Sequence, residues 1–216
     1  MKNHQTLNPM DIAHKVCLWI TPTAGEPVQQ KGENMKFYKE ADFMNNGYRC
    51  IVLFIYSGHR TAYVGIPESH PLYKQKYGEE SPLLSFDAIK DQQQGKRGII
   101  PLVCFAFSSK NEEDGVRPDV FFDVHGSITY SDFHQEWTEE NDTRWYFGFD
   151  CGHAGDANDY RTALRHGLIS EEHYKYMVSL YERFGVDGEV RSLQYCIEEC
   201  EHLAEQLYLI EKANKQ

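Results

Sequence analysis

The sequence is poor in basic residues and has no long hydrophobic run. Its 22 Lys and Arg residues stand against 33 Asp and Glu residues, which gives a formal net charge of −11. This acidity argues against a nucleic-acid groove, which needs cations to neutralise phosphates, and allows docking to a basic partner surface. No apolar segment approaches membrane-spanning length, and no signal-type apolar core follows Met1–Gln5. We therefore expect a cytosolic protein that does not contact a membrane.

The cysteine spacing typical of metal or redox motifs is also absent, although the chain contains six cysteines. No C-x-x-C pair occurs. Most of the cysteines lie in apolar segments, where a thiol behaves as a small hydrophobic side chain, and a reducing compartment is the simplest expectation. The six are Cys17, Cys50, Cys104, Cys151, Cys196 and Cys200.

The most regular patterns in the first part of the chain are those of β-strands. Tyr48–Tyr56 is apolar at successive positions, as expected of a central strand buried on both faces. Ser57–Arg60 is a turn signal, so Thr61–Ile66 is predicted to return as the hairpin partner. A further strand begins at Trp145, because Trp145, Phe147 and Phe149 share one face of an extended chain.

Other segments are less regular. Met35–Met44 is predicted to form one or two helical turns, and Asp119–Val124 a strand whose extended pattern continues over Ser127–Tyr130. Ile99–Phe107 is apolar enough for a buried strand, although its Pro101 places the start at an edge. The acidic segment Asp132–Asp142 is predicted to be a solvated connection.

Beyond residue 157 the pattern becomes helical. Asn158 or Asp159 can cap a short helix, and Ser170 can cap a second one that Gly185 ends. The last helix repeats apolar residues at steps of three and four, and we expect it to form an αα-hairpin with the helix before it. Its apolar residues are Leu193, Cys196, Ile197, Cys200, Leu203, Ala204, Leu207 and Ile210.

Strands followed by helices predict an α+β fold, in which C-terminal helices cover one face of an antiparallel sheet. We divide the chain into a mainly β domain over 1–157, with an excursion over 72–118, and a helical segment over 158–216 packed on that domain. The apolar stripe of the last helix can pack on the sheet or form a symmetric homodimer.

Reactive side chains gather where two of the predicted strands end. Asp123–Gly126 closes one strand and Asp150–Asp156 closes the other. If these strands pair, two imidazoles and two carboxylates could converge, a set that suits Zn²⁺, Mn²⁺ or Fe²⁺ better than Ca²⁺. Alternatively, the carboxylates only hold the loop through local hydrogen bonds. The four candidate metal ligands are His125, Asp150, His153 and Asp156.

Two short matches suggest enzymatic alternatives. D-x-H-G at Asp123–Gly126 and G-D-x-x-D at Gly155–Asp159 resemble two blocks of calcineurin-like metallophosphoesterases, although no later G-N-H block follows. His125-Gly126-Ser127 resembles the NAD-contacting step of ADP-ribosyltransferases, with Tyr146 as a second-block tyrosine. Cys151 is a third option, as a nucleophile with His153 or His125 as its base.

Three longer segments resemble a group of small bacteriophage-encoded accessory proteins of uncharacterised function. They are Y-V-G-I-P-E-S-H-P-L-Y at Tyr63–Tyr73, D-V-H-G-S-I-T-Y-S at Asp123–Ser131 and W-Y-F-G-F-D-C-G-H-A-G-D at Trp145–Asp156. This chain is longer than that pattern between the first two segments, which implies that the excursion over 72–118 is peripheral. The resemblance implies an accessory protein in the cytosol of an infected bacterium that counteracts a host defence. It also implies a site built from His70, His125, Asp150, His153 and Asp156.

The leading hypothesis is a small ligand, such as a nucleotide, or a divalent metal bound where these segments meet. The amides of Gly152–Gly155, together with His59, Arg60 and Arg161, could serve an anion. One rival hypothesis is an interaction protein that blocks a host factor with its acidic surface and helical hairpin. The other is a metal-dependent hydrolase or phosphoesterase.

Overall fold

The computed structural model describes residues 36–84, 115–133, 136–185 and 188–215. The chain divides into two compact units, Met1–Glu33 and Asn34–Gln216, and every described residue belongs to the second unit. The strand predicted at Ile99–Phe107 lies outside the described residues, and the predicted division at residue 157 stays a prediction. The strands are β1 (Phe37–Asn45), β2 (Tyr48–Ile55), β3 (Arg60–Ile66), β4 (Tyr130–Asp132) and β5 (Trp145–Asp150), and the helices are α4 (Pro118–Phe121), α5 (Tyr160–Arg165), α6 (Glu171–Phe184) and α7 (Leu193–Ala213).

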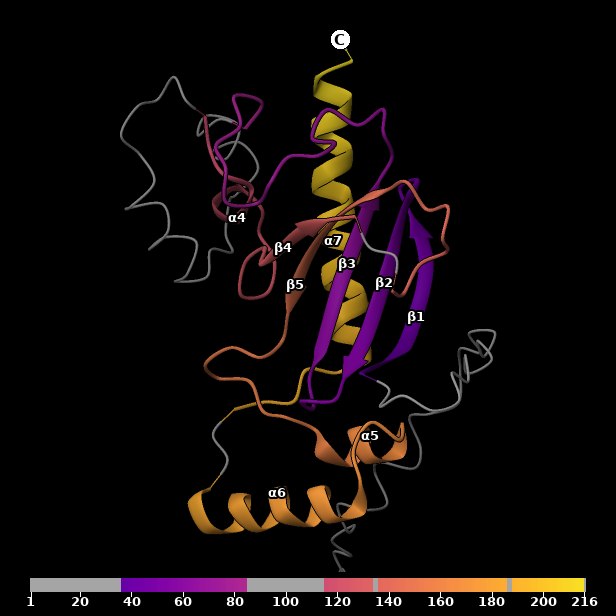
Figure 1. Ribbon diagram of the computed structural model, residues 1–216. Coiled ribbons are helices and arrows are strands. Elements are labelled where there is room, and N and C mark those ends of the chain that lie inside the picture. The colour runs from indigo at the N-terminus through magenta and orange to yellow at the C-terminus, as the bar shows by residue number, and fades with distance from the viewer. Residues whose placement is uncertain (1–35, 85–114, 134–135, 186–187, 216) are drawn as a thin grey trace, which may run out of the picture. The chain divides into compact units, whose positions relative to one another are not determined.

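The five strands form one antiparallel sheet in the order β1-β2-β3-β5-β4 (Figure 1). The predicted central strand and its hairpin partner are confirmed as β2 and β3, which pair from Arg49↔Gly65 to Phe54↔Arg60. β5 comes from far along the chain and lies beside β3, with Val64 opposite Phe147. This pairing brings the loop after β5 to the end of the sheet where β3 begins.

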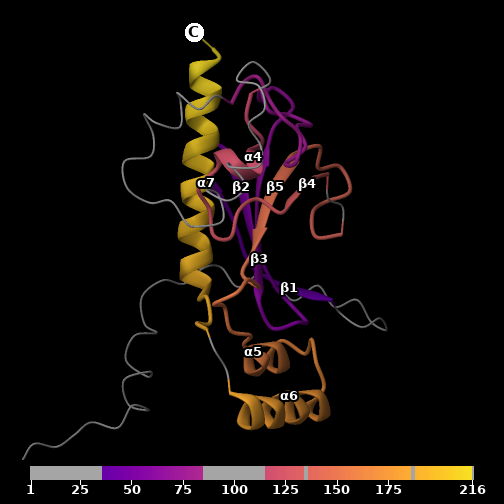
Figure 2. The ribbon, with the colours of Figure 1, turned by 90° about the vertical axis from the view of Figure 1, so that its left-hand side faces the viewer.

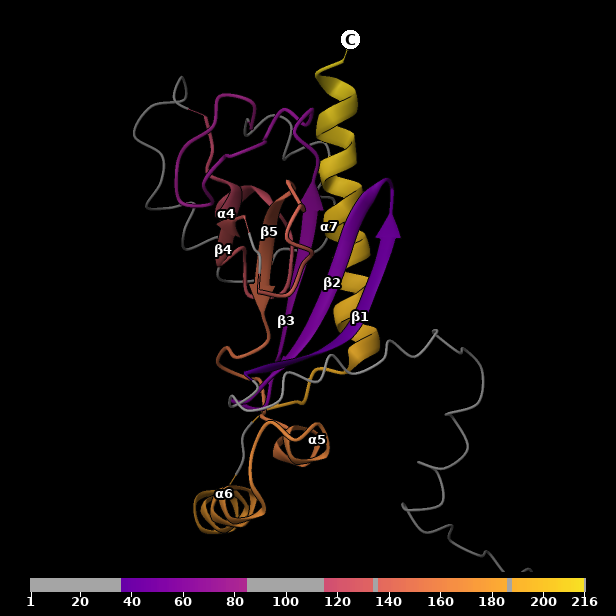
Figure 3. The same cartoon turned by 45° about the vertical axis from the view of Figure 1, so that its right-hand side comes forward.

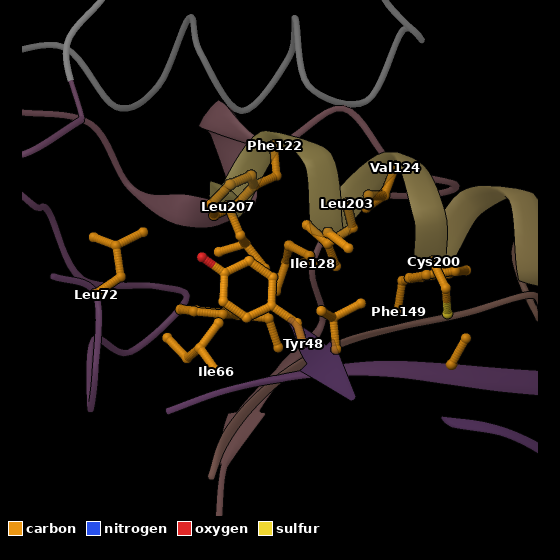
Figure 4. Close-up of a cluster of buried hydrophobic side chains, with 14 of the residues drawn as sticks. Tyr48, Ile66, Leu72, Phe122, Val124, Ile128, Phe149, Cys200, Leu203 and Leu207 are labelled. Carbon is orange, nitrogen blue, oxygen red and sulfur yellow. The ribbon is translucent and has the colours of Figure 1, made fainter. Parts of the chain in front are cut away.

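Helix α7 covers one face of the sheet, as Figure 2 shows from the side. Its stripe of Cys196, Cys200, Leu203 and Leu207 is buried in the main hydrophobic cluster together with side chains of β2, β3 and β5. Figure 4 shows Leu203 and Cys200 packed with Ile128 and Phe149. The predicted α+β fold is confirmed, and the stripe packs on the sheet of its own chain.

Helices α5 and α6 lie beyond the ends of the strands (Figure 3). Their predicted N-caps are confirmed, since Asp159 accepts a hydrogen bond from the Thr162 amide and Ser170 accepts one from the His173 amide. The predicted αα-hairpin is wrong: α6 packs on α5, where Tyr160 contacts Tyr181, and α7 packs on the sheet. No residue of α6 is buried, so α6 has no buried apolar face that packs against α7.

Two predicted elements have the opposite conformation. Met35–Met44 was expected to be helical, but β1 pairs along its length with β2, and this ladder outweighs the local preference of Lys39, Glu40 and Ala41 for helix. Asp119–Val124 was expected to be a strand, but it begins within the short helix α4. Pro118 occupies the first turn of α4, where its missing N–H is harmless, and Asp119 lies at the positive end of the helix dipole.

The acidic segment before β5 is not simply solvated. Its Trp137 packs with Tyr146 on the sheet face opposite α7. The buried Asp142 carboxylate accepts hydrogen bonds from Arg49 at 2.9 Å and from the Tyr146 hydroxyl at 2.7 Å. The prediction of a solvated connection is therefore wrong for Asp142, because Arg49 from β2 supplies a long-range partner for this acid. Glu136, Glu139 and Glu140 are exposed, as predicted.

Candidate functional site

The two motif ends converge beside the N-terminal end of α7. The Nε2 atom of His125 lies 2.8 Å from Oδ2 of Asp156, and the same oxygen accepts the His153 amide at 3.0 Å. The rings of His125 and His153 lie 5.7 Å apart, centroid to centroid. Asp123–Ser131 and Trp145–Asp156 thus contribute to one site, although Asp123 follows the helix α4 and not a strand.

The Asp156 carboxylate is the centre of this arrangement. Its side chain is 2% exposed, and its second oxygen accepts a hydrogen bond from Arg191 Nε at 2.7 Å. Burial alone would raise the pKa of Asp156, but Arg191, His125 and the His153 amide together hold that pKa below its usual value. Asp156 is therefore ionised at neutral pH and fixes the orientation of the His125 ring.

The second nitrogen of His125 contacts a tyrosine. Its Nδ1 atom lies 3.0 Å from the Tyr195 hydroxyl, and its backbone amide donates to Glu199 at 2.7 Å. Burial and the Glu199 carboxylate raise the pKa of Tyr195 to about 12. Because Asp156 favours a proton on Nε2, Nδ1 is the acceptor and Tyr195 the donor. Carboxylate, imidazole and phenol form a continuous hydrogen-bonded chain.

His153 has a nitrogen without a partner. Its Nε2 atom is buried and makes no hydrogen bond with any residue that the structure describes, although Asp150 Oδ1 lies 3.7 Å away. Asp150 accepts hydrogen bonds from the Thr129 hydroxyl and the Gly152 amide. The His59 ring borders Gly152, at 3.0 Å from the position where a Cβ atom would lie. Burial lowers the pKa of His59 despite the nearby carboxylates of the loop, so His59 favours the neutral form.

The backbone beneath His153 is unusual. Gly126 has a φ of +68°, and a Cβ atom at this position would lie 2.0 Å from the His153 ring. The next residue, Ser127, has a φ of +101°, which side-chain-bearing residues rarely adopt. Its buried hydroxyl donates to the Asp119 carbonyl at 2.5 Å, and this bond holds the conformation. Such strain is found most often at functional sites.

Three of the predicted site residues do not join this group. Arg60 is buried and forms hydrogen bonds to Glu40 at 2.6 and 3.0 Å and to the Arg191 carbonyl at 2.7 Å. Arg161 lies exposed on α5, and among the described residues no hydrogen bond or ion pair links it to the site. The expectation of an anion site with these arginines is wrong, because Glu40 neutralises the buried one.

His70 belongs to another part of the fold. It is 2% exposed, accepts the Leu72 amide on Nδ1 and donates from Nε2 to the Leu207 carbonyl. Leu207 follows Tyr195 by twelve residues on α7, which separates the two by about 18 Å. The inclusion of His70 in the site is therefore wrong, and its role is to tie the turn after β3 to α7.

The metal prediction is not supported by the side-chain geometry. Within the described ranges, no three His, Cys, Asp or Glu side chains are arranged to hold a metal ion. The Asp156 oxygens already contact His125, His153 and Arg191, and the amides of Gly152 and His153 contact carboxylates of their own loop. The four predicted ligands come together as a hydrogen-bonded group instead.

The other catalytic alternatives also fail on geometry. Cys151 is 2% exposed with its Sγ atom 3.6 Å from Cys196 Sγ, and this contact and burial raise the pKa of Cys151. A buried, protonated thiol is not a nucleophile. Tyr146 lies on the sheet face opposite α7 and donates to Asp142, so it cannot act with His125 as the ADP-ribosyltransferase resemblance requires.

Sequence reasoning missed Arg191, Tyr195, Glu199 and Thr129. Tyr195 and Glu199 are four residues apart and thus lie on one face of α7. This four-residue spacing was the only signal in the sequence, and it does not show that both side chains contact His125.

Comparisons with protein-family models, curated proteins and solved structures find no match for this chain. Within the described part of the chain, none of the helices combines the length and apolarity needed to cross a membrane. The function is therefore argued from the site itself.

Proposed function

We propose that this protein binds a small polar ligand at the histidine–aspartate cluster, the group formed by His59, His125, Asp150, His153 and Asp156. The observation that carries the proposal is the buried Nε2 atom of His153, which lacks a hydrogen-bond partner beside the Asp150 carboxylate. Buried polar atoms in native proteins are nearly always paired, and an exception calls for a missing partner. A ligand with N–H or O–H groups would donate to Asp150, whose side chain is 30% exposed. It would reach His153 Nε2 once the ring turns away from Gly126, against which that atom packs.

A purely structural loop would not need these groups. The hydrogen bonds from Gly152 to Asp150 and from His153 to Asp156 already hold the turn. The chain from Asp156 through His125 to Tyr195 links that turn to other segments rather than closing it, and the positive φ of Ser127 destabilises the fold. A backbone conformation that lowers stability is expected where its geometry serves ligand binding.

The setting in which the ligand acts is proposed from the motif resemblance. The segments that resemble bacteriophage accessory proteins supply His125, Asp150, His153 and Asp156. We therefore place the protein in the cytosol of an infected bacterium, where it counteracts a host defence by sequestering or sensing a small molecule.

The test compares His153→Ala and His125→Ala with His173→Ala, a control on the exposed face of α6. Thermal melts with separate panels of amines, polyols, nucleotides and divalent metals would identify a class that stabilises the wild type. We expect His173→Ala to keep this ligand-induced shift, and the two cluster variants to lose it while remaining folded. Ligand shifts of equal size in all four proteins would contradict the proposal and leave the loop as a structural turn.

A second candidate is a protein that binds a host factor through α6. None of the residues of α6 is buried, and Tyr176 and Phe184 are 60% and 73% exposed. Lysate from a susceptible bacterium would be passed over the immobilised wild type and a Tyr176→Ser/Phe184→Ser variant. A host protein retained equally by both would rule out this helix as the contact.

A further inference from the structure

A second candidate site lies at the hollow formed by the turn after β3 and the segments on either side of the acidic loop. It has a volume of about 520 Å³, within the range typical of small-molecule sites. None of its lining residues belongs to the histidine–aspartate cluster. The lining residues are Tyr73, Phe133, Glu140, Asn141, Asp142 and Thr143.

Two aromatic rings form the apolar wall of this hollow. Tyr73 and Phe133 contact each other edge to face, with ring centroids 5.9 Å apart. The Tyr73 hydroxyl donates to the Thr143 carbonyl at 2.9 Å, and Phe133 packs edge to face against Trp145 at 5.0 Å. Both rings are thus held in place, while Phe133 is still 38% exposed. A positioned, partly exposed ring is a platform on which a planar group can stack.

The charged groups around the rings differ in whether they are paired. Asp142 is held by Arg49 and Arg144, and Lys76 pairs with Asp132. In contrast, the ammonium of Lys74 has no carboxylate partner within the described residues. It lies over the rings, 5.4 Å from the centroid of Tyr73 and 5.7 Å from that of Phe133.

Two polar side chains of the lining differ from the paired Asp142. The side chains of Glu140 and Asn141 make no hydrogen bond with any described residue, and both are exposed. The hollow therefore presents an aromatic platform, a cation at its rim, and a carboxylate and an amide on its wall. Each of these groups recognises a different part of a nucleotide.

We propose that this hollow binds a guanine mononucleotide. Lys74 would turn outward from the rings, over which it now lies, and pair with the phosphate, while the base stacks on Phe133 in its place. The Glu140 carboxylate would accept the two N–H groups on the Watson–Crick edge of guanine. Adenine presents an unprotonated N1 there and would be disfavoured by the carboxylate. A single nucleotide fits better than a nucleic-acid strand, because the net charge of −11 opposes a polyanion.

Calorimetric titration of the full chain with GMP, AMP, CMP and inorganic phosphate would test this site. We expect GMP to bind most tightly and phosphate alone to bind far more weakly. Lys74→Ala should weaken GMP binding about tenfold or more, because a charge-assisted hydrogen bond is lost. Glu140→Gln should remove the preference for GMP over AMP. Lys175→Ala, which removes an exposed charge on α6, is the control and should bind as the wild type does.

Several results would overturn the assignment. No binding of GMP at concentrations up to about 1 mM would refute it, and equal binding of GMP and AMP by the wild type would refute the choice of guanine. If His153→Ala abolished GMP binding while Lys74→Ala and Phe133→Ala retained it, the nucleotide would bind at the histidine–aspartate cluster. That outcome would support the proposed function and refute the second site. Because Lys74 is exposed, its variant tests the site even if Phe133→Ala unfolds.

Discussion

His125 and Asp156 are 31 positions apart in the sequence, and their side chains form a hydrogen bond of 2.8 Å between Nε2 and Oδ2. This bond joins the turn before β4 to the loop after β5. Since Asp156 also binds Arg191, the segment leading into α7 is attached to the same carboxylate. A change at Asp156 should therefore affect the sheet end and the start of α7 together.

Asp156→Asn should lower the free energy of unfolding at pH 7 by about 2–4 kcal/mol, because Arg191 and His125 lose a buried anionic partner. The pKa of Asp156 is depressed in the folded state. Its contribution is therefore present above the ordinary Asp value of about 4 and disappears as the pH falls through the lower, folded-state pKa. Urea denaturation at pH 7, 5 and 3 should show the difference between wild type and variant shrinking at the lowest pH.

Glu171→Gln is a suitable control for this pH series, because it removes a carboxylate from an exposed pair with Lys175 on α6. Its effect should be within about 0.5 kcal/mol at every pH. A difference between wild type and Asp156→Asn that stays constant from pH 7 to pH 3 would show that the charge of Asp156 does not stabilise the fold.

Gly126→Ala should displace the His153 ring, because the added Cβ atom would lie 2.0 Å from it. Gly155→Ala is a matched control: Gly155 also has a positive φ, of +94°, but nothing lies within 4 Å of an added Cβ atom. Both variants should lose about 1–2 kcal/mol to backbone strain, and Gly126→Ala about 1–3 kcal/mol more to overpacking. Imidazole NMR signals of His153 should shift in Gly126→Ala, and equal stability of the two variants would show that the glycine does not support the ring.

Leu203→Ala should lower the free energy of unfolding by about 2–5 kcal/mol, because Leu203 is fully buried between α7 and the sheet. Leu209→Ala is the control on the same helix, since Leu209 is 42% exposed, and should cost less than about 1 kcal/mol. Chemical denaturation of both variants measures the difference. Similar losses for both would indicate that the outward face of α7 is also covered, as in a homodimer.

Cys151 should resist alkylation in the native protein at neutral pH, because burial and the Cys196 contact keep its thiol protonated. Iodoacetamide labelling followed by peptide mapping should find Cys151 modified only after denaturant is added. Rapid modification of Cys151 in the native state would restore it as a candidate nucleophile.

Local sequence patterns correctly predicted the elements whose structure depends mainly on their own residues. β2 is apolar on both faces because it packs under α7 on one side and against Trp137 on the other. The caps Asp159 and Ser170 marked the beginnings of α5 and α6 correctly. β1 was misjudged because its helix-forming residues are overruled by pairing with β2, a tertiary effect that no local window contains.

The site was predictable only in part for the same reason. His125, His153 and Asp156 meet as predicted, but the strand expected to end before His125 is in part the helix α4. The exclusion of Arg60 depends on Glu40, twenty positions earlier, and that of His70 depends on the Leu207 carbonyl, 137 positions later. Such partners are invisible until the sheet and α7 are in place.

The position of α7 in the chain has a consequence for biosynthesis. The ribosome completes all five strands before it makes Leu193–Ala213, the segment that covers their shared apolar face. Until that segment emerges, Val52 of β2 and Val64 of β3 lack the cover that α7 gives them, and a nascent chain in this state would be prone to self-association and would engage chaperones. A ribosome that stalled or stopped within the codons for α7 would thus release an aggregation-prone sheet rather than a slightly shortened protein.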